Sequence, residues 1–271
     1  PMKKLILLAM ACLAINSCKN EPKNYLTFSG KITNQNSDSL VIINNETGPI
    51  RTLKLKENGS FKDTITLQTG LYIIYDGKDN AFCFFKNGSE INMTTDASSF
   101  KQSLKFSGSG SKESNHLTES HLAQNQLTSD NSLFELPKDD FLSKINKFIE
   151  EQDKNLYETK LDTNFISIHK KQIKSFKDQI LYNYDHKAYI RKHLAKGHVS
   201  PKFSNYENHN GGTTSLDDLK GKYVYIDLWT TWCKPCEKEI PHLKKIEKQL
   251  HDKNIVFVGI SIDQKKDHET W

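Results

Sequence analysis

The sequence of 271 residues is poor in several features, and each scarcity excludes a class of protein. It has five cysteines but a single Cys-x-x-Cys, whereas a structural zinc site needs a second pair of Cys or His ligands at suitable spacing. The nearest histidines, His242 and His251, fall on the outer side of a predicted helix. We therefore expect no metal site.

Long apolar runs and basic stripes are also missing. No segment after residue 15 is apolar enough to cross a bilayer. Lys and Arg together number 38 against 33 Asp and Glu, and the basic residues form no stripe interleaved with aromatics, so we expect no nucleic-acid partner. What remains is polar but foldable, with 36% hydrophobic residues and a mean hydropathy of −0.65. Length and composition predict two or three folded units.

The N-terminal segment predicts export. Two lysines precede a short apolar core over residues 5–15, too short to span a bilayer. The following Ile15-Asn16-Ser17-Cys18 resembles a bacterial lipobox, although Asn16 departs from the commonest pattern. That resemblance implies a signal peptide over residues 1–17, a lipid on Cys18, a tether over residues 18–24, and a cell-envelope location facing the periplasm. Ordinary secretion with an incidental Cys18 is the alternative.

Residues 25–108 predict a β-rich domain, because apolar residues alternate or form short runs between turn signals. Asn58-Gly59 and Asn87-Gly88 are pairs that tight hairpins favour, and Asp76-Gly77 is a third turn signal. We expect a small antiparallel sandwich or barrel of about six to eight strands. Cys83 should pack in a strand as a small apolar residue.

Residues 109–198 predict a helical region that follows a flexible boundary at Ser107–Ser111. Two apolar stripes at helical spacing indicate two long helices, the second ending near a C-cap at Gly197, and a weaker helix is expected over 113–127. The stripes are Phe141, Ile145, Phe148, Ile149 and Leu156, then Phe165, Ile173, Phe176, Ile180 and Tyr184. No ligand spacing joins the histidines of this region to acids, so they are predicted to lie on the surface; they are His169, His186, His193 and His198.

The chemistry is concentrated in one stretch near the C-terminus. Residues 223–228 read as a buried strand, Cys233 and Cys236 follow, and Ile240, Leu243, Ile246 and Leu250 then lie on one face of a helix. A helix N-terminus offers unpaired N–H groups and partial positive charge, which stabilise the thiolate that carries disulfide exchange. We therefore predict a redox-active dithiol in which Cys233 attacks and Cys236 resolves.

The motif Asp-Leu-Trp-Thr-Thr-Trp-Cys-Lys-Pro-Cys resembles the active-site segment of the thioredoxin superfamily. The flanking Lys220-Gly221-Lys222 and Glu239-Ile240-Pro241 are similar to the membrane-tethered TlpA/ResA-like thiol-disulfide oxidoreductases. The resemblance implies a flanking aromatic at Trp232, a helix-kinking Pro241, and a buried acid at Asp227 that relays a proton to the resolving cysteine. Pro235 is similar to its counterpart in reducing thioredoxins, and Lys234 either tunes the thiolate or is merely solvated.

The resulting expectation is a multi-domain chain. An N-terminal all-β sandwich or barrel, similar to an uncharacterised domain found ahead of thioredoxin-like modules in bacterial lipoproteins, precedes the helical region and a partial thioredoxin-like α/β fold over 199–271. The implied partners are disulfide-containing periplasmic proteins, apocytochrome c among them, a membrane thiol electron donor, and the membrane through the lipid. No cofactor beyond the Cys233–Cys236 disulfide is expected.

Two alternatives of other classes stay open. Thr230 lies three residues before Cys233, as a peroxiredoxin motif requires, but Ile226 stands where that motif has proline. The other alternative is a non-catalytic envelope lipoprotein with a thioredoxin remnant. The thioredoxin-like pattern stops after the strand at 255–262 and the start of a further helix near Asp263, before any cis-proline that would bind substrate, so we expect a C-terminally truncated domain with little reductase activity.

Overall fold

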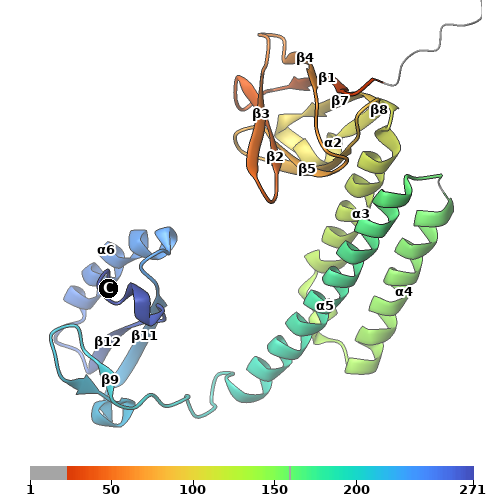
Figure 1. The fold of residues 1–271 in the computed structure, drawn as a ribbon. Helices are drawn as coiled ribbons and strands as arrows, with labels where there is room; N and C mark the ends of the chain where they lie inside the picture. The colour runs from red at the N-terminus through yellow and green to blue at the C-terminus, as the bar shows by residue number, and fades with distance from the viewer. Residues whose placement is uncertain (1–22, 159) are drawn as a thin grey trace, which may run out of the picture. The chain divides into compact units, whose positions relative to one another are not determined.

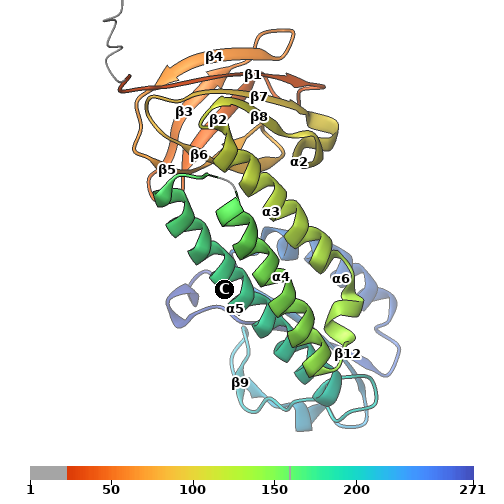
Figure 2. The same cartoon turned by 90° about the vertical axis from the view of Figure 1, so that its right-hand side faces the viewer.

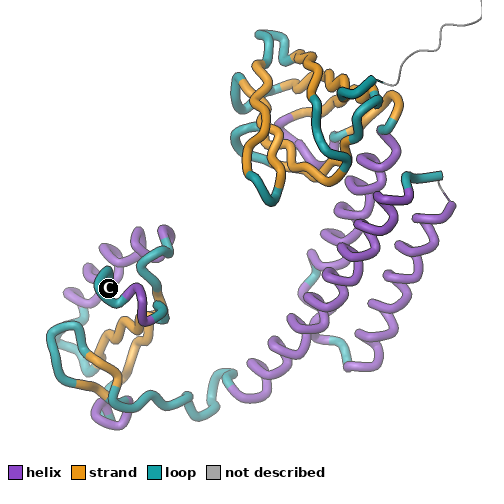
Figure 3. Tube along the Cα trace, in the orientation of Figure 1, coloured by secondary structure: helices purple, strands orange, loops and turns teal. Residues whose placement is uncertain are grey.

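The computed structural model describes residues 23–158 and 160–271, in two units that divide between Ala188 and Tyr189. Figure 1 shows the order of the elements along the chain, and Figure 3 marks helix, strand and loop along the same trace. The predicted layout of β-rich, helical and mixed regions is confirmed. The predicted lipidation at Cys18 lies outside the described residues. No helix within the described ranges is long and apolar enough to cross a bilayer.

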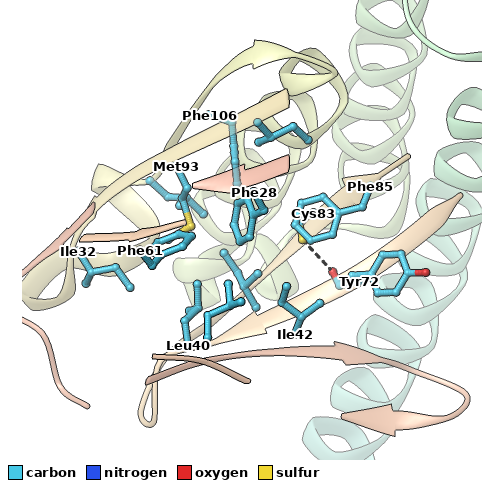
Figure 4. Packing of buried hydrophobic residues seen from close by; sticks show 14 of the residues in the cluster. Phe28, Ile32, Leu40, Ile42, Phe61, Tyr72, Cys83, Phe85, Met93 and Phe106 are labelled. Carbon is cyan, nitrogen blue, oxygen red and sulfur yellow. Dashed lines mark hydrogen bonds between the residues drawn. The ribbon is translucent and has the colours of Figure 1, made fainter. Parts of the chain in front are cut away.

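The first unit begins with a sandwich of two four-stranded sheets, in the orders β4-β1-β7-β8 and β3-β2-β5-β6. Their core combines aliphatic side chains with a group of aromatic rings: the ring of Phe28 lies 5.1 Å from that of Phe61 and 4.9 Å from that of Phe85, which belongs to the other sheet (Figure 4). Burying a side chain of this size stabilises the fold by about 1.5–3 kcal/mol. The strands are β1 Leu26–Thr33, β2 Ser39–Asn44, β3 Gly48–Lys54, β4 Ser60–Ile65, β5 Gly70–Tyr75, β6 Asn80–Phe85, β7 Glu90–Asp96 and β8 Lys105–Ser109.

The expectation of a purely antiparallel domain was wrong, because β1 pairs with β7 in parallel. Asp76-Gly77 does join the paired strands β5 and β6, but the other two turn signals do not form hairpins. Asn58-Gly59 and Asn87-Gly88 each connect strands of different sheets, β3 to β4 and β6 to β7. Their glycines have φ of 76° and 86°, so the sequence correctly predicted left-handed turns at these positions. Which strands pair on either side of each turn is decided by the tertiary fold.

Cys83 is confirmed as a buried strand residue, fully shielded in β6. Its thiol lies 3.6 Å from the carbonyl oxygen of Tyr72, as the dashed line in Figure 4 marks. Burial raises the pKa of the Cys83 thiol well above its usual range, so this cysteine is a packed, neutral group.

The predicted flexible boundary at Ser107–Ser111 was wrong, because β8 and α3 (Ser111–Ser129) occupy it. Gly108 has φ of 94°, and a Cβ there would lie 2.2 Å from the carbonyl oxygen of Glu90, so this glycine permits close strand packing. The short η1 (Ala97–Ser99) and α2 (Phe100–Ser103) link β7 to β8.

Helix α3 covers an edge of each sheet. The Asn115 side chain accepts from the N–H of Phe106 and donates to its carbonyl, each at 2.8 Å, in the edge strand β8. The Ser114 hydroxyl bonds in the same way to the N–H and carbonyl of Phe84 in the edge strand β6. The two side chains replace a neighbouring strand, which protects edges that would otherwise invite pairing with another chain.

Two longer helices, α4 (Lys138–Glu158) and α5 (Thr163–His193), lie alongside α3 (Figure 2). Phe141 and Ile145 of α4 pack with Ile180 and Tyr184 of α5 and with η2 (Asn131–Glu135). Both predicted stripes therefore face the bundle. Helix α5 ends at His193, four residues before the predicted cap, and Gly197 lies in a separate turn with φ of 94°.

The prediction of a surface position for His169 was wrong, because its side chain is 2% exposed. Its ring stacks on Phe165, with centroids 5.4 Å apart, and meets the ring of His116 at 4.9 Å. The helical spacing of His169 with Phe165 and Ile173 places all three on the buried face of α5.

The second unit contains a parallel pair, β11 (Tyr223–Trp229) and β12 (Ile255–Ser261), joined by α6 (Lys234–Gln249). The predicted strand-helix-strand crossover with parallel strands is confirmed. The predicted burial of residues 223–228 was wrong, because no residue of β11 is fully buried and Tyr223 and Leu228 are 77% and 60% exposed. Before it come a small hairpin of β9 (Tyr206–Glu207) and β10 (Thr213–Thr214) and the turn η3 (Leu216–Leu219). The helix expected near Asp263 is only the short η4 (Lys265–Asp267).

Candidate active site

The turn between β11 and α6 places both cysteines. The N–H of Cys233 donates to the carbonyl of Thr230 at 3.1 Å, which closes the turn, and Cys233 is the N-cap of α6. Pro235 lies in the first turn of the helix, where a missing N–H costs nothing. The apolar run thus ends as a strand, and the helix begins at the first cysteine.

The two sulfurs are joined in a disulfide, with Cα atoms 5.2 Å apart. The N–H of Cys236 points at the sulfur of Cys233 at 3.2 Å. When the bond is reduced, this N–H and the unpaired N–H groups of the first turn are donors for a thiolate at Cys233. Both cysteines are half-buried, so accessibility alone does not distinguish them.

The neighbours of the dithiol are more exposed than the disulfide itself. Trp232 is 70% exposed beside Cys233. The Lys234 ammonium lies 3.0 Å from the carboxylate of Glu237 on the same helix. This exposed ion pair favours the interpretation in which Lys234 is solvated over the one in which it tunes the thiolate. Glu239 is exposed on α6, and Pro241 lies inside the helix.

Asp227 is half-buried, so it is not the fully buried acid that the resemblance implied. It lines a cleft of about 720 Å³ between β11 and α6, with Tyr225, Trp229, Ile240 and Leu243 among the other walls. The strand β11 alternates its faces, and Asp227 therefore lies on the side that α6 covers. Its proton-relay role stays a prediction.

Asp263 is a site residue that sequence reasoning missed. Its carboxylate accepts hydrogen bonds from the backbone N–H and hydroxyl of Thr231 and from the hydroxyl of Ser261. Burial acts to raise the pKa of Asp263, but these hydrogen bonds outweigh it and the pKa is lowered. The position of Asp263 in the sequence could have indicated its role. Parallel strands bring their carboxyl ends to one edge of the sheet, so residues after β12 lie beside residues after β11.

Comparisons with known proteins match two parts of the chain. Residues 197–271 match the AhpC/TSA family, and residues 26–115 match a domain of unknown function, DUF4369. The chain is 33% identical to the thiol-disulfide oxidoreductase ResA of Bacillus subtilis over 28% of its own length and 42% of that protein. It is 34% identical to the thioredoxin-like protein YneN of the same organism, over 31% of this chain and 51% of the relative.

A solved relative is titled a putative thiol-disulfide oxidoreductase from Bacteroides vulgatus. It is 49% identical over 28% of this chain and 50% of that one, with a TM-score of 0.24. The chain spans about half the length of the relatives it matches. Its C-terminal region is therefore similar to a TlpA/ResA-like thioredoxin-fold module, and a region that matches DUF4369 precedes it.

Proposed function

We propose that the chain acts as a thiol-disulfide oxidoreductase, reducing or exchanging disulfides of periplasmic proteins through Cys233 and Cys236. The observation that carries the proposal is the disulfide at the N-terminus of α6, with the N–H of Cys236 directed at the sulfur of Cys233. A thiolate there is both stabilised and half-exposed, which are the two properties that disulfide exchange requires.

The reduced protein would act in two steps. The Cys233 thiolate attacks one sulfur of a substrate disulfide, forming a mixed disulfide and releasing one substrate thiolate. The Cys236 thiolate then attacks the Cys233 sulfur, which releases the second substrate thiolate and leaves the Cys233–Cys236 disulfide. Two electrons pass to the substrate, whose thiolates take up protons. A thiol donor at the membrane restores the dithiol by the reverse exchange.

Side chains around the dithiol have proposed supporting roles. Asp227 lies on the α6 side of β11, where it could take the proton that Cys236 releases when that cysteine attacks. The exposed Trp232 offers an apolar surface next to Cys233 for a substrate chain. Pro235, in the first turn, is consistent with a reductase, which sets the proposed direction.

The catalytic test is reduction of insulin by dithiothreitol, with and without the full chain. The chain should accelerate the reaction measurably, although less than a complete thioredoxin-like domain would, because its pattern predicts a truncated domain. Cys233→Ser should abolish this acceleration, whereas Cys83→Ala in the β domain should preserve it. A rate equal to that of dithiothreitol alone would favour the non-catalytic lipoprotein. Consumption of hydrogen peroxide without insulin reduction would favour the peroxiredoxin alternative.

The substrate test uses a trap. Cys236→Ser should leave Cys233 joined to its substrate, because the resolving thiol is gone. Non-reducing gels followed by mass spectrometry would identify the trapped proteins, with Cys233→Ser as the control that traps none. An apocytochrome c among them would define one substrate. Recovery of the same proteins on both variants would contradict a mixed disulfide at Cys233.

We further propose that a lipid on Cys18 holds the chain at the cell envelope, facing the periplasm. The support is the lipobox-like sequence that ends at Cys18 and the charged, apolar segment before it. Two or more acyl chains bind a membrane far more firmly than one. Cys18→Ala should move the protein to the soluble periplasmic fraction and abolish acyl labelling, whereas unchanged membrane fractionation would contradict the anchor.

A further inference from the structure

One carboxylate joins the two loops that follow the parallel strands of the second unit. Trp229 and Ser261, the last residues of β11 and β12, are paired in register. Beyond them, the Asp263 carboxylate accepts from the Thr231 N–H at 3.0 and 3.1 Å, from the Thr231 hydroxyl at 3.0 Å and from the Ser261 hydroxyl at 2.6 Å. These contacts fix Thr231 through its main chain as well as its side chain.

Thr231 lies inside the turn that delivers Cys233 to the helix. The preceding residue, Thr230, is 3% exposed and accepts the hydrogen bond from the Cys233 N–H. Asp263 therefore immobilises the centre of a turn whose two ends are a buried residue and the N-cap of α6. A change in this turn would move the Cys233 sulfur relative to the N–H of Cys236.

We propose that Asp263 is a positioning residue for the dithiol, which holds the Cys233 sulfur against the N-terminus of α6 through Thr231. The inference rests on the proposed function only in taking Cys233 as the reacting thiol. Asp263 touches neither cysteine in the hydrogen bonds it makes; its effect passes through the turn.

A positional role and a charge effect of Asp263 predict opposite shifts of the Cys233 pKa when the side chain is removed. A carboxylate near a thiolate disfavours the charged form, so if Asp263 acted by charge, both Asp263→Asn and Asp263→Ala should lower the pKa of Cys233. If it acts by position, Asp263→Ala should raise that pKa, because the sulfur drifts from the N–H groups that stabilise the thiolate. Asp263→Asn should then resemble the parent, since the amide can accept from Thr231 and donate to the Ser261 oxygen.

The experiment measures the rate at which iodoacetamide alkylates Cys233 in the reduced full chain, as a function of pH, with peptide mapping to separate the two cysteines. We expect Asp263→Ala to raise the midpoint of the pH profile of alkylation. It should also slow alkylation near neutral pH about fivefold, which corresponds to the free energy of about one hydrogen bond. Thr231→Val, which removes the hydroxyl but keeps the N–H contact, should give a smaller shift in the same direction.

Glu269→Ala is the matched control, since it removes an exposed carboxylate from the same segment and should leave the profile unchanged. A lowered midpoint in both Asp263 variants, or an unchanged midpoint in Thr231→Val and Asp263→Ala, would overturn the proposal. If Asp263→Ala fails to fold, an unchanged pH profile in Thr231→Val is by itself enough to overturn the proposal. The assay needs no substrate, so loss of the proposed activity and loss of this inference are distinguishable.

Discussion

At the scale of residues, what separates the two cysteines is their hydrogen bonding and not their exposure. Both side chains are half-buried, but only the Cys233 sulfur receives a backbone N–H, from Cys236. Cys236 lies inside the first turn of α6, where its own N–H is directed back at the N-cap. The reactivity difference should therefore come from thiolate stability.

We expect Cys233 to alkylate faster than Cys236 in the reduced protein near neutral pH. The helix end contributes about 0.3–1 kcal/mol to the anion, a rate difference of about twofold to fivefold before the N–H contact is counted. Brief iodoacetamide labelling with peptide mapping measures it, and the buried Cys83 serves as the internal unreactive thiol. Equal rates, or faster labelling of Cys236, would reverse the assigned roles.

The buried His169 and the half-buried His116 both pack against Phe165, and they should give the first unit a pH dependence. Burial lowers the pKa of His169, against the hydrogen bond from its ring to Gln172, and lowers the pKa of His116, against the charge of Glu113. The Nε2 atoms of both rings are buried and have no hydrogen-bond partner among the residues that the structure describes. A proton on either ring would therefore be poorly accommodated.

The direction in which stability changes with pH follows from proton linkage. The unfolded histidines take up protons near about pH 6.5, above the lowered pKa of the folded state, so stability is full above that pH and falls as the pH decreases below it. We predict a lower melting temperature for the first unit at about pH 5 than at about pH 7.5. His169→Gln should flatten this dependence, whereas His186→Gln, at an exposed position on the same helix, should not. Parallel pH profiles for both variants would contradict the prediction.

At the scale of elements, α3 couples the sandwich to the helical bundle. Its N-terminal turns satisfy backbone groups of β6 and β8, and further along, the Ser120 hydroxyl donates to Gln152 of α4 at 2.7 Å in a buried position. The match to the domain of unknown function ends at residue 115, inside α3. The first turns of this helix thus form part of the β domain.

Removing the Asn115 side chain should destabilise the first unit markedly. Asn115→Ala leaves the N–H and the carbonyl of Phe106 without their partners, which costs about 1–3 kcal/mol. Urea unfolding monitored by circular dichroism measures the loss. Asn125→Ala, at an exposed position on the same helix, is the control and should change stability by less than about 0.5 kcal/mol. Equal losses would show that the edge contacts contribute nothing specific.

At the scale of the whole molecule, the two units differ in how much they bury. The first has apolar cores in the sandwich and in the bundle. In the described residues of the second, Phe203 and Thr230 are the buried ones, and Tyr223, Leu228 and Ile262 are at least 60% exposed. Few buried contacts leave backbone hydrogen bonds open to local unfolding.

We therefore expect amides of β11 and β12 to exchange with deuterium at least about tenfold faster than those of β1 and β5. Hydrogen exchange with mass spectrometry on the full chain measures this, with α3 as an internal reference for the protected unit. Equal protection of the two units would show that the second is stabilised by contacts beyond those described.

Local patterns in the sequence determined the chemistry and the order of the elements. The strand before Cys233, the helical spacing after it and the Cys-x-x-Cys are contiguous, and hydrogen bonding within a few residues is enough to set a turn, an N-cap and a helix. The alternation in residues 26–85 and the two apolar stripes up to Tyr184 likewise specify strands and helices, because burial follows the period of each element.

Only the tertiary structure decided which distant residues meet. The parallel pairing of β1 with β7, the burial of His169 and the edge contacts of Asn115 each depend on segments far apart in the chain. Asp263 belongs to this group: it lies 32 residues from Thr231, and an acid after a strand becomes part of the site only when parallel pairing aligns the two strand ends. The spacing of apolar residues in the sequence determines which face of a helix or strand is buried. The order of strands in the sheets and the closure of loops determine which residues pack against that face.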